Sequence, residues 1–147
     1  MWNCQQCGAC CHNHTVLITG RDLREINQYY PHIDLKKAIC LLSPNAEFKD
    51  PENLLSQYPI VEISADLPDQ APIRGYLALK FEEISRTPQR ITQCVFYSPS
   101  QLIASDHNGC AIHEHKPLIC LSYPFQINDD LSVEFHGTRC PDRKSVV

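Results

Sequence analysis

Residues 4–11, CQQCGACC, place four cysteines within eight consecutive positions. The spacing C-x2-C-x2-C lets a tight turn direct neighbouring sulfurs toward one metal, as in zinc knuckles and iron–sulfur loops. Gly8 follows the second cysteine and supplies the backbone freedom that such a turn requires. One C-x2-C pair often arises by chance, whereas two overlapping pairs are a strong signal. The stretch therefore predicts a metal-binding turn around which the domain is built.

The adjacent cysteines, Cys10 and Cys11, raise a geometric question. In an extended chain, neighbouring side chains point to opposite sides. Two adjacent residues are then awkward ligands for one small tetrahedral ion. We therefore expect the two sulfurs to serve different metals, or different edges of one cluster, with the pair acting as a hinge between two coordination groups.

Four further cysteines complete a set of eight. Eight thiolates divide into two sets of four, the usual complement of a structural zinc or a cubane cluster. Pro141 directly follows the last cysteine, as in ferredoxin-type loops, and adds slight support for iron–sulfur. The predicted metal ligands are Cys4, Cys7, Cys10, Cys11, Cys94, Cys110, Cys120 and Cys140.

The ninth cysteine, Cys40, lies in the apolar stretch AICLL, and we expect it to be an ordinary core residue. Two other interpretations of the eight remain open. The thiols could be buried apolar side chains that never bind metal, or they could form a disulfide framework. The odd total of nine cysteines excludes complete pairing within the chain.

Several histidines lie near the cysteines and could replace a thiolate as a ligand, although hydrogen bonding to a ligand or a surface position is the more frequent role. His113 is the favoured candidate because it lies three residues after Cys110. The others are His12, His14 and His115.

The composition is that of an ordinary globular protein: 147 residues, 43% hydrophobic and 20% charged, with a formal net charge of -4. The acidic balance gives no reason to expect nucleic acid as a partner. There is no run of 18 apolar residues and no basic start before an apolar stretch, so we expect neither a membrane span nor export. A cytoplasmic location follows as the prediction, and reducing conditions favour metal binding over disulfides.

Hydrophobic periodicity predicts a small α+β fold: a single domain over residues 1–147, with a short antiparallel sheet, a few helices and long loops around the cysteine-rich metal site. Thr19 and Asp34 are suitable residues to begin helices, and Pro44 to end one. The expected helices are 19–30, 35–42 and 114–123. The expected strands are 15–19, 73–81, 92–98 and 131–137, with a further strand near 59–64 in an otherwise irregular stretch from 43 to 72, and a tight turn at 107–110.

Other side chains point to no particular reaction. Asp22 and Arg24 could serve a substrate pocket, but a helix cap and a solvated face explain them as well. Residues 123–125, YPF, could shield the metal site or belong to the core. There is no nucleophile–base arrangement, phosphate-binding loop or dinucleotide fingerprint.

The sequence resembles the CxxCxxCC family, described as a zinc- or iron-chelating domain and often labelled an iron–sulfur-cluster-containing protein. The first four cysteines match the motif that names the family, and Cys94 matches the cysteine that opens its central hydrophobic stretch. Cys110 with Ile112 matches a C-x-I-Y segment, and Cys140 matches the last cysteine. The segments KPLIC and YPF match R-P-x-x-C and Y/F-P.

The departures from the family pattern are His113 for a tyrosine, and Lys116 and Leu121 for arginines. Lysine cannot reproduce the bidentate fork of arginine, which argues against anion binding at these positions.

The resemblance implies a chelating domain without specifying a reaction. We expect a protein that holds zinc or an iron–sulfur cluster through eight thiolates, with metal ions as its ligands and a protein partner left open. The alternative is an iron–sulfur oxidoreductase, cluster-dependent enzyme or redox partner that acts on a small molecule or a protein side chain.

Overall fold

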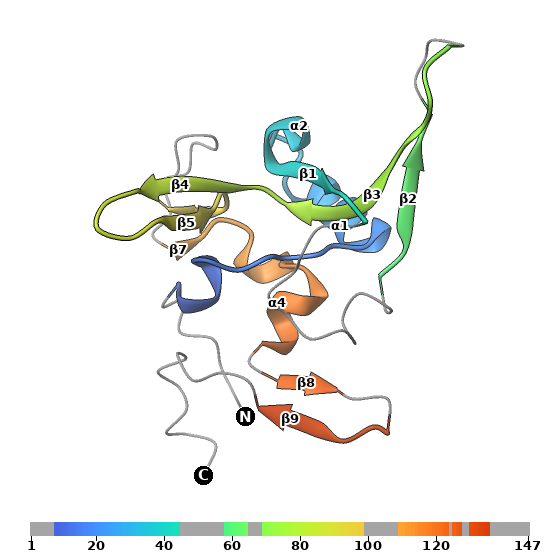
Figure 1. The fold of residues 1–147 in the computed structure, drawn as a ribbon. Coiled ribbons are helices and arrows are strands. Elements are labelled where there is room, and N and C mark those ends of the chain that lie inside the picture. Colours follow the sequence, from blue (N-terminus) through green and yellow to red (C-terminus); the bar gives the residue numbers. More distant parts are fainter. Residues whose placement is uncertain are drawn as a thin grey trace.

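The computed structural model describes residues 8–44, 58–64, 69–98, 109–123, 125–127 and 130–135 (Figure 1). These ranges contain a few short helices and several short antiparallel strands, which confirms the α+β class. In chain order they are η1 (Ala9–Cys11), α1 (Gly20–Tyr29), α2 (Leu35–Ala38), β1 (Ile39–Leu42), β2 (Ile60–Ile63), β3 (Ile73–Leu79), β4 (Phe81–Ser85), β5 (Ile91–Cys94), β6 (Tyr97–Ser98), β7 (Gly109–Cys110), η2 (His113–His115), α4 (Leu118–Ser122), β8 (Phe125–Ile127) and β9 (Val133–Phe135), where η marks a 3₁₀ turn.

The long ribbon formed by β3 and β4 organises the molecule (Figure 1). β3 is the central strand of a three-stranded antiparallel sheet in the order β1-β3-β2, and β4 continues into a hairpin with β5. Lys80 joins the two parts: its N–H donates to the Ala38 carbonyl at 2.7 Å, and its carbonyl accepts from the Val95 N–H at 3.1 Å. The same ribbon therefore holds β1 at one end and the β5 segment, with Cys94, at the other.

The segment before α1 lies beside β3, but it does not form the strand expected at 15–19. The Ile18 N–H donates to the Leu77 carbonyl at 2.9 Å, and the Leu79 N–H donates to the Val16 carbonyl at 2.8 Å. Leu17 forms an isolated bridge with Ala78 rather than part of a longer ladder. This segment fixes the path of the chain as it leaves the cysteine turn.

The first helix follows the prediction closely. Thr19 and Asp22 form a reciprocal capping box at its start, and Tyr30 is the C-cap. Asp34 caps the second helix through the Lys36 N–H, also as expected.

The second predicted helix is too long. It stops at Ala38, and residues 39–42 form β1 because they pair in register with β3, Ile39 opposite Leu79 and Leu42 opposite Tyr76. Tertiary pairing outweighs the local preference for helix in this apolar run.

Two other predicted elements are divided. The strand expected at 92–98 is interrupted by a turn at Val95 and Phe96, which separates β5 from β6. The helix expected at 114–123 is broken at Lys116, whose backbone is extended at φ -69° and ψ 155°. A residue before proline is disfavoured in helical geometry, so α4 begins only after Pro117, which is its N-cap.

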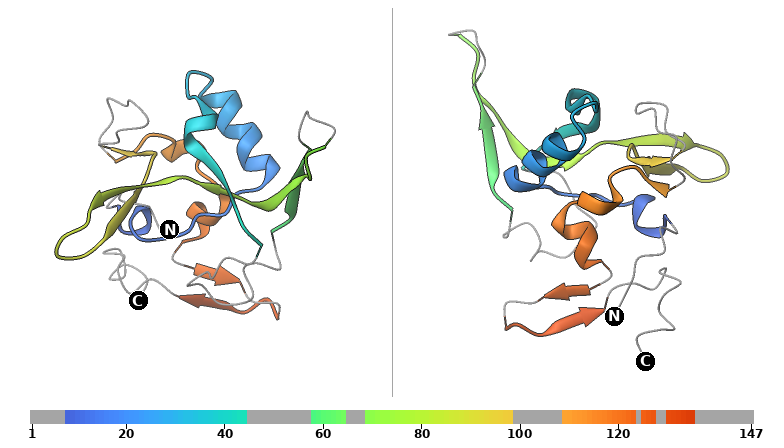
Figure 2. Two further views of the ribbon diagram at one scale, coloured as in Figure 1. Left: turned by 45° about the horizontal axis from the view of Figure 1, so that its top comes forward. Right: turned by 180° about the vertical axis from the view of Figure 1, so that it is seen from behind.

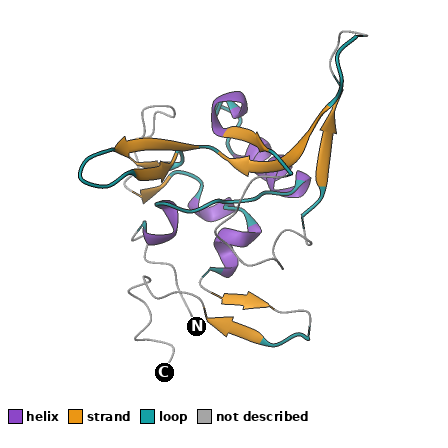
Figure 3. Ribbon diagram, in the orientation of Figure 1, coloured by secondary structure: helices purple, strands orange, loops and turns teal. Residues whose placement is uncertain are grey.

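Two small antiparallel pairs, β6-β7 and β8-β9, complete the described sheets. β9 lies within the strand expected at 131–137, whereas β8 was not anticipated. Figure 3 shows η1 and α4 on the side of the β3–β4 ribbon away from α2, and the reversed view in Figure 2 agrees. Of the turn expected at 107–110, only the last two residues fall within the described ranges, where they form β7.

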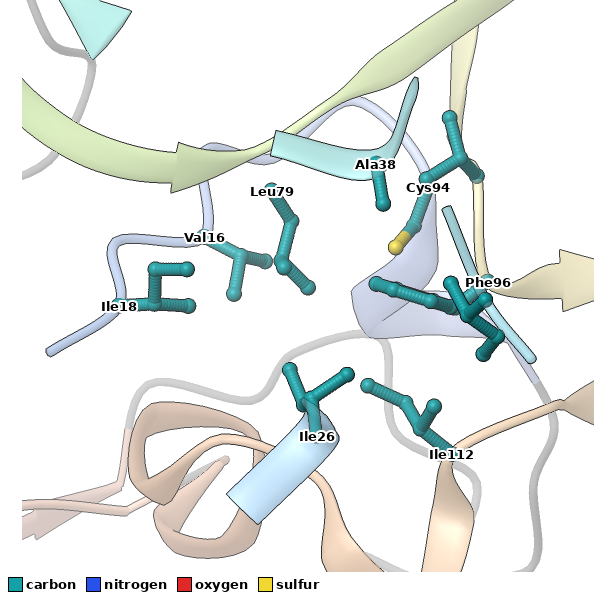
Figure 4. Close-up of a cluster of buried hydrophobic side chains, with 10 residues drawn as sticks. Val16, Ile18, Ile26, Ala38, Leu79, Cys94, Phe96 and Ile112 are labelled. Atoms are coloured by element: carbon teal, nitrogen blue, oxygen red, sulfur yellow. The ribbon is translucent and has the colours of Figure 1, made fainter. Parts of the chain in front are cut away.

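The main apolar core is built from residues of α1, α2, β3 and β5 and of the segments beside them (Figure 4). Ile26 of α1 is completely buried, and Phe96 and Ile112 are almost so. The buried members of this cluster are Val16, Ile18, Ile26, Ile33, Ala38, Leu79, Cys94, Val95, Phe96 and Ile112. Within the described ranges, none of the helices combines the length and apolar character needed to cross a lipid bilayer.

Truncation of Ile26 should test the importance of this core. Ile26→Ala removes apolar contacts and leaves a cavity, so we expect the free energy of unfolding to fall by about 2–5 kcal/mol in denaturant titration. Ile73→Ala is the matched control because Ile73 is 60% exposed, and its effect should stay within about 0.5 kcal/mol. Equal effects of the two substitutions would contradict the assignment of the core.

Candidate metal centre

Five of the eight predicted ligands lie in the described ranges, and four of them lie in or against the main apolar core. Cys94 ends β5 and belongs to the buried cluster, where its sulfur faces Phe96 and Ala38 in Figure 4. Cys11, Cys110 and Cys120 pack against that cluster from η1, β7 and α4. Four separate segments therefore deliver thiols to one region.

Several of these thiols lie close enough to influence the pKa values of others. The pKa of Cys11 is raised by the neighbouring groups of Cys10, Cys94 and Cys110, after hydrogen bonding and burial. Cys10, Cys94 and Cys110 also raise the pKa of Cys120, after the larger effect of burial. The five residues, Cys10, Cys11, Cys94, Cys110 and Cys120, are called the thiol cluster below.

The adjacent pair does not have the extended geometry on which the hinge hypothesis depends. Cys10 and Cys11 lie in the 3₁₀ turn η1, and their Sγ atoms are 3.9 Å apart. Two sulfurs bound tetrahedrally to one zinc at about 2.3 Å would be about 3.8 Å apart. The expectation of divergent side chains is therefore wrong, because the turn places the two sulfurs side by side.

Gly8 makes this turn possible. Its φ of 78° lies in the left-handed region, and its carbonyl accepts a 2.9 Å hydrogen bond from the Cys11 N–H. A Cβ atom at this position would also collide with the Tyr97 ring. The glycine is required both for its backbone conformation and for the close approach of Tyr97.

The proton affinities of the cluster reflect its crowding. The hydrogen bond from Cys11 lowers the pKa of Cys10 to about 7, and the nearby Lys116 and His12 act in the same direction against the effect of burial. That shared hydrogen bond raises the pKa of Cys11. Burial raises the pKa of Cys94 to about 12. Near neutral pH, metal binding would therefore have to displace protons from most of these thiols.

The described residues do not form a closed ligand set by themselves. No three or more His, Cys, Asp or Glu side chains among them are grouped so that they could hold a metal ion. The remaining predicted ligands, Cys4, Cys7 and Cys140, lie outside the described residues.

The structure separates the candidate histidines. His12 Nδ1 lies 2.7 Å from the Gly8 carbonyl, and its Nε2 lies 3.2 Å from Gln93 Oε1. Gln93 Nε2 donates to the Tyr97 carbonyl at 2.9 Å, which leaves Oε1 facing the imidazole. Both nitrogens of His12 therefore face oxygens, an arrangement that anchors η1 to β5 and leaves neither nitrogen directed at a metal.

The other histidines have different surroundings. His115 stacks on Tyr29 with ring centroids 3.5 Å apart, and His14 meets Tyr123 edge to face at 5.9 Å. His113 Nε2 is buried and has no hydrogen-bond partner among the described residues. Burial, followed by the charge of Lys116, lowers the pKa of His113 and so favours the neutral imidazole that metals bind.

Cys40 lies apart from the thiol cluster. It is in β1, where it pairs with Ala78, and it packs against a second apolar cluster of Leu17, Tyr76 and Ala78. Its apolar packing agrees with the expectation of a core residue, but Cys40 is only half-buried and lies in a strand rather than in a helix.

Asp22 connects the first helix to the segment that carries Cys120. Its Oδ2 accepts from the Thr19 N–H and hydroxyl, both at 2.8 Å. Its Oδ1 accepts from the Leu118 N–H at 3.0 Å, at the start of α4. The carboxylate thus serves as a cap for two helices, whereas Arg24 is exposed. The capping motif predicted only the first of these roles.

Comparison with known families decides the wider assignment. The sequence model of the CxxCxxCC family, described as "Putative zinc- or iron-chelating domain", matches residues 3–141, nearly the whole chain. This chain belongs to the CxxCxxCC family. No curated protein and no solved structure matches it. As a CxxCxxCC protein it is assigned to metal chelation, and the soft sulfur donors of the thiol cluster suit zinc or iron.

The low pKa of Cys10 predicts unusual reactivity. In chelator-treated protein, alkylation of Cys10 should rise through pH 7, because a lowered pKa leaves the thiolate present at lower pH. Cys120 should react slowly, since burial keeps its thiol protonated. Replacement of the hydrogen-bond donor in Cys11→Ala should move the Cys10 midpoint to higher pH.

Mass spectrometry of alkylated peptides across pH 5–9 would measure each rate. Cys40, outside the cluster, provides the reference thiol. An unchanged Cys10 midpoint in Cys11→Ala would contradict the hydrogen-bonded pair.

The double cap predicts a second effect. Asp22→Ala leaves donors at the starts of two helices without the acceptor they share, so the free energy of unfolding should fall by about 1–3 kcal/mol. Asp34→Ala, which removes an exposed cap of α2, should lower it by about 1 kcal/mol. Hydrogen exchange should show loss of protection at Leu118 only in the Asp22 variant, and equal exchange in both would reject the link to α4.

Proposed function

We propose that this CxxCxxCC protein holds zinc or an iron–sulfur cluster through the thiolates of eight cysteines. The observation that carries the proposal is that four of them, from four segments, lie in or against the same apolar core, with the Cys10 sulfur 3.9 Å from that of Cys11. The ligands would be Cys4, Cys7, Cys10, Cys11, Cys94, Cys110, Cys120 and Cys140.

The donors of the thiol cluster fit these metals better than a disulfide framework. Cys10, Cys11, Cys94 and Cys120 are free thiols. Soft sulfur donors select zinc and iron–sulfur sites over magnesium, calcium or manganese. Location in a reducing cytoplasm would keep the thiols available and is part of the proposal.

The geometry of the adjacent pair favours particular forms of site. In a cubane cluster with four cysteines, each iron takes one protein sulfur, whereas a tetrahedral zinc or one iron of a two-iron cluster takes several. The 3.9 Å separation of the Cys10 and Cys11 sulfurs therefore supports both binding the same metal atom. Zinc would stabilise the fold, and a two-iron cluster would also supply one-electron chemistry.

The protein's own residues would shape this site. η1 orients the adjacent pair, the Asp22 carboxylate fixes the start of the helix that bears Cys120, and the core excludes water behind Cys94. These are positioning roles, and they support a chelating function without assigning a reaction.

Metal content tests the proposal directly. Protein purified without oxygen should contain zinc, or iron with matching acid-labile sulfide and brown colour. Cys10→Ser and Cys120→Ser should lower the metal content, whereas Cys40→Ser should leave it unchanged because that thiol lies in the second cluster. Wild-type protein with neither element would overturn the proposal.

A double substitution tests whether the adjacent pair shares one metal atom. If it does, Cys10→Ser/Cys11→Ser should lose no more metal than either single variant, since residues that act together are not additive. Additive loss of metal, measured by elemental analysis at equal protein concentration, would instead support the hypothesis that Cys10 and Cys11 serve two different coordination groups.

A further inference from the structure

The adjacent cysteines, Cys10 and Cys11, are placed to react with each other. Their Sγ atoms lie 3.9 Å apart, and both residues are partly exposed, so small reagents reach them. A disulfide requires the two sulfurs to approach to about 2.05 Å, and rotation about the Cα–Cβ bonds can close that difference. In an extended chain the same side chains would point to opposite sides and could not meet.

The turn that carries the pair is held from both sides. At its start, the Gly8 carbonyl accepts from the Cys11 N–H at 2.9 Å and lies 2.7 Å from His12 Nδ1. Just after it, the Asn13 N–H donates to the Thr92 carbonyl at 2.9 Å, and the Thr92 N–H donates to Asn13 Oδ1 at 2.8 Å. The backbone therefore keeps the two sulfurs close, and such preorganisation accelerates a reaction between two groups.

We propose that Cys10 and Cys11 form a reversible disulfide with each other when the metal-free protein meets a hydroperoxide. The pair is then a site of redox modification. A reactive cysteine beside a second cysteine that resolves its oxidised form is the arrangement typical of thiols that respond to oxidants. Formation of the bridge does not rest on the proposed function, because the reaction needs only the two sulfurs and the oxidant.

The reaction takes two steps. The thiolate of one cysteine attacks the hydroperoxide, so that an S–O bond forms, the O–O bond breaks, and the leaving alkoxide or hydroxide takes up the proton that the thiol lost. The sulfur of the second cysteine then attacks the sulfenic acid. The S–S bond forms, the S–O bond breaks, and the leaving hydroxide takes the proton of the second thiol to become water. The pair loses two electrons and the hydroperoxide gains them.

The bridge should be easy to reduce. Cα atoms of adjacent residues are about 3.8 Å apart across a trans peptide, whereas disulfides usually join Cα atoms about 4.4–6.8 Å apart. A bridge between neighbours is therefore strained, and strained disulfides are the labile ones. Oxidation would also remove two of the eight proposed ligands, a consequence that does rest on the proposed function.

The experiment uses the full chain, reduced, freed of metal with a chelator, separated from both reagents and then exposed to hydrogen peroxide. Free thiols are blocked with one alkylating reagent, disulfides are reduced, and the released thiols are labelled with a second. Peptide mass spectrometry should find the second label on Cys10 and Cys11 together in a monomeric chain, and the first label on Cys40. A sample treated with reduced glutathione before blocking should carry only the first label at all three.

Two other results would overturn the proposal. One is a second label that pairs Cys10 or Cys11 with any other cysteine or with another chain. The other is addition of oxygen to either sulfur without a bridge.

A glycine substitution tests the role of the turn. Gly8→Ala should slow formation of the bridge by about tenfold or more, because Gly8 has a left-handed backbone and a Cβ there would meet the Tyr97 ring. Gly20→Ala is the matched control, since nothing lies within 4 Å of the position of its Cβ. Equal rates in the two variants would contradict preorganisation by the turn. If Gly8→Ala does not fold, the label pattern of the wild type decides.

Zinc titration of the oxidised and reduced chains separates this inference from the proposed function. A bridged chain that binds zinc more weakly supports both. A bridged chain with unchanged zinc affinity supports the redox site and removes Cys10 and Cys11 from the proposed ligands. A chain that binds zinc but forms no bridge overturns only the redox site.

Discussion

The crowding of thiols against an apolar surface is the constraint on which the rest of the structure depends. Burial and the neighbouring thiols raise the pKa values of Cys11, Cys94 and Cys120. Such a group can become a set of thiolates only with positive charge beside it. A bound metal ion would supply such a charge, in keeping with the chelating family to which the chain belongs. The cluster therefore needs a neighbouring positive charge before its thiols can deprotonate together.

The parts of the fold that depend on neighbouring residues could be predicted from the sequence. Thr19 and Asp22 form the capping box of α1 because both partners lie within one helical turn. The end of α2 could not be predicted in the same way, since Ile39 becomes a strand residue only by pairing with Leu79 forty positions later. Lys116 lies between these cases. The proline that follows it explains its extended backbone. The apolar periodicity of the segment nevertheless favoured a helix that ran through this residue.

The candidate site, like the fold, could be predicted from the sequence only in part. The spacing of the first cysteines, the count and context of the later ones and the family resemblance selected Cys10, Cys11, Cys94, Cys110 and Cys120 as candidate ligands, and left Cys40 apart. The relation between Cys10 and Cys11 required the backbone of η1, which depends on Gly8 and on the distant Tyr97. The burial of Lys116 and the hydrogen bond from Leu118 to Asp22 could not be predicted from the local sequence. Both arise from contacts between segments far apart in the chain.

The arrangement of the cluster also sets the order of events during biosynthesis. Its sulfurs come from residue 10, near one end of the chain, and from residue 120, close to the other. Because synthesis proceeds from the amino terminus, the first thiols leave the ribosome long before their partners exist. The thiol cluster can therefore assemble only after α4 has been synthesised and has docked.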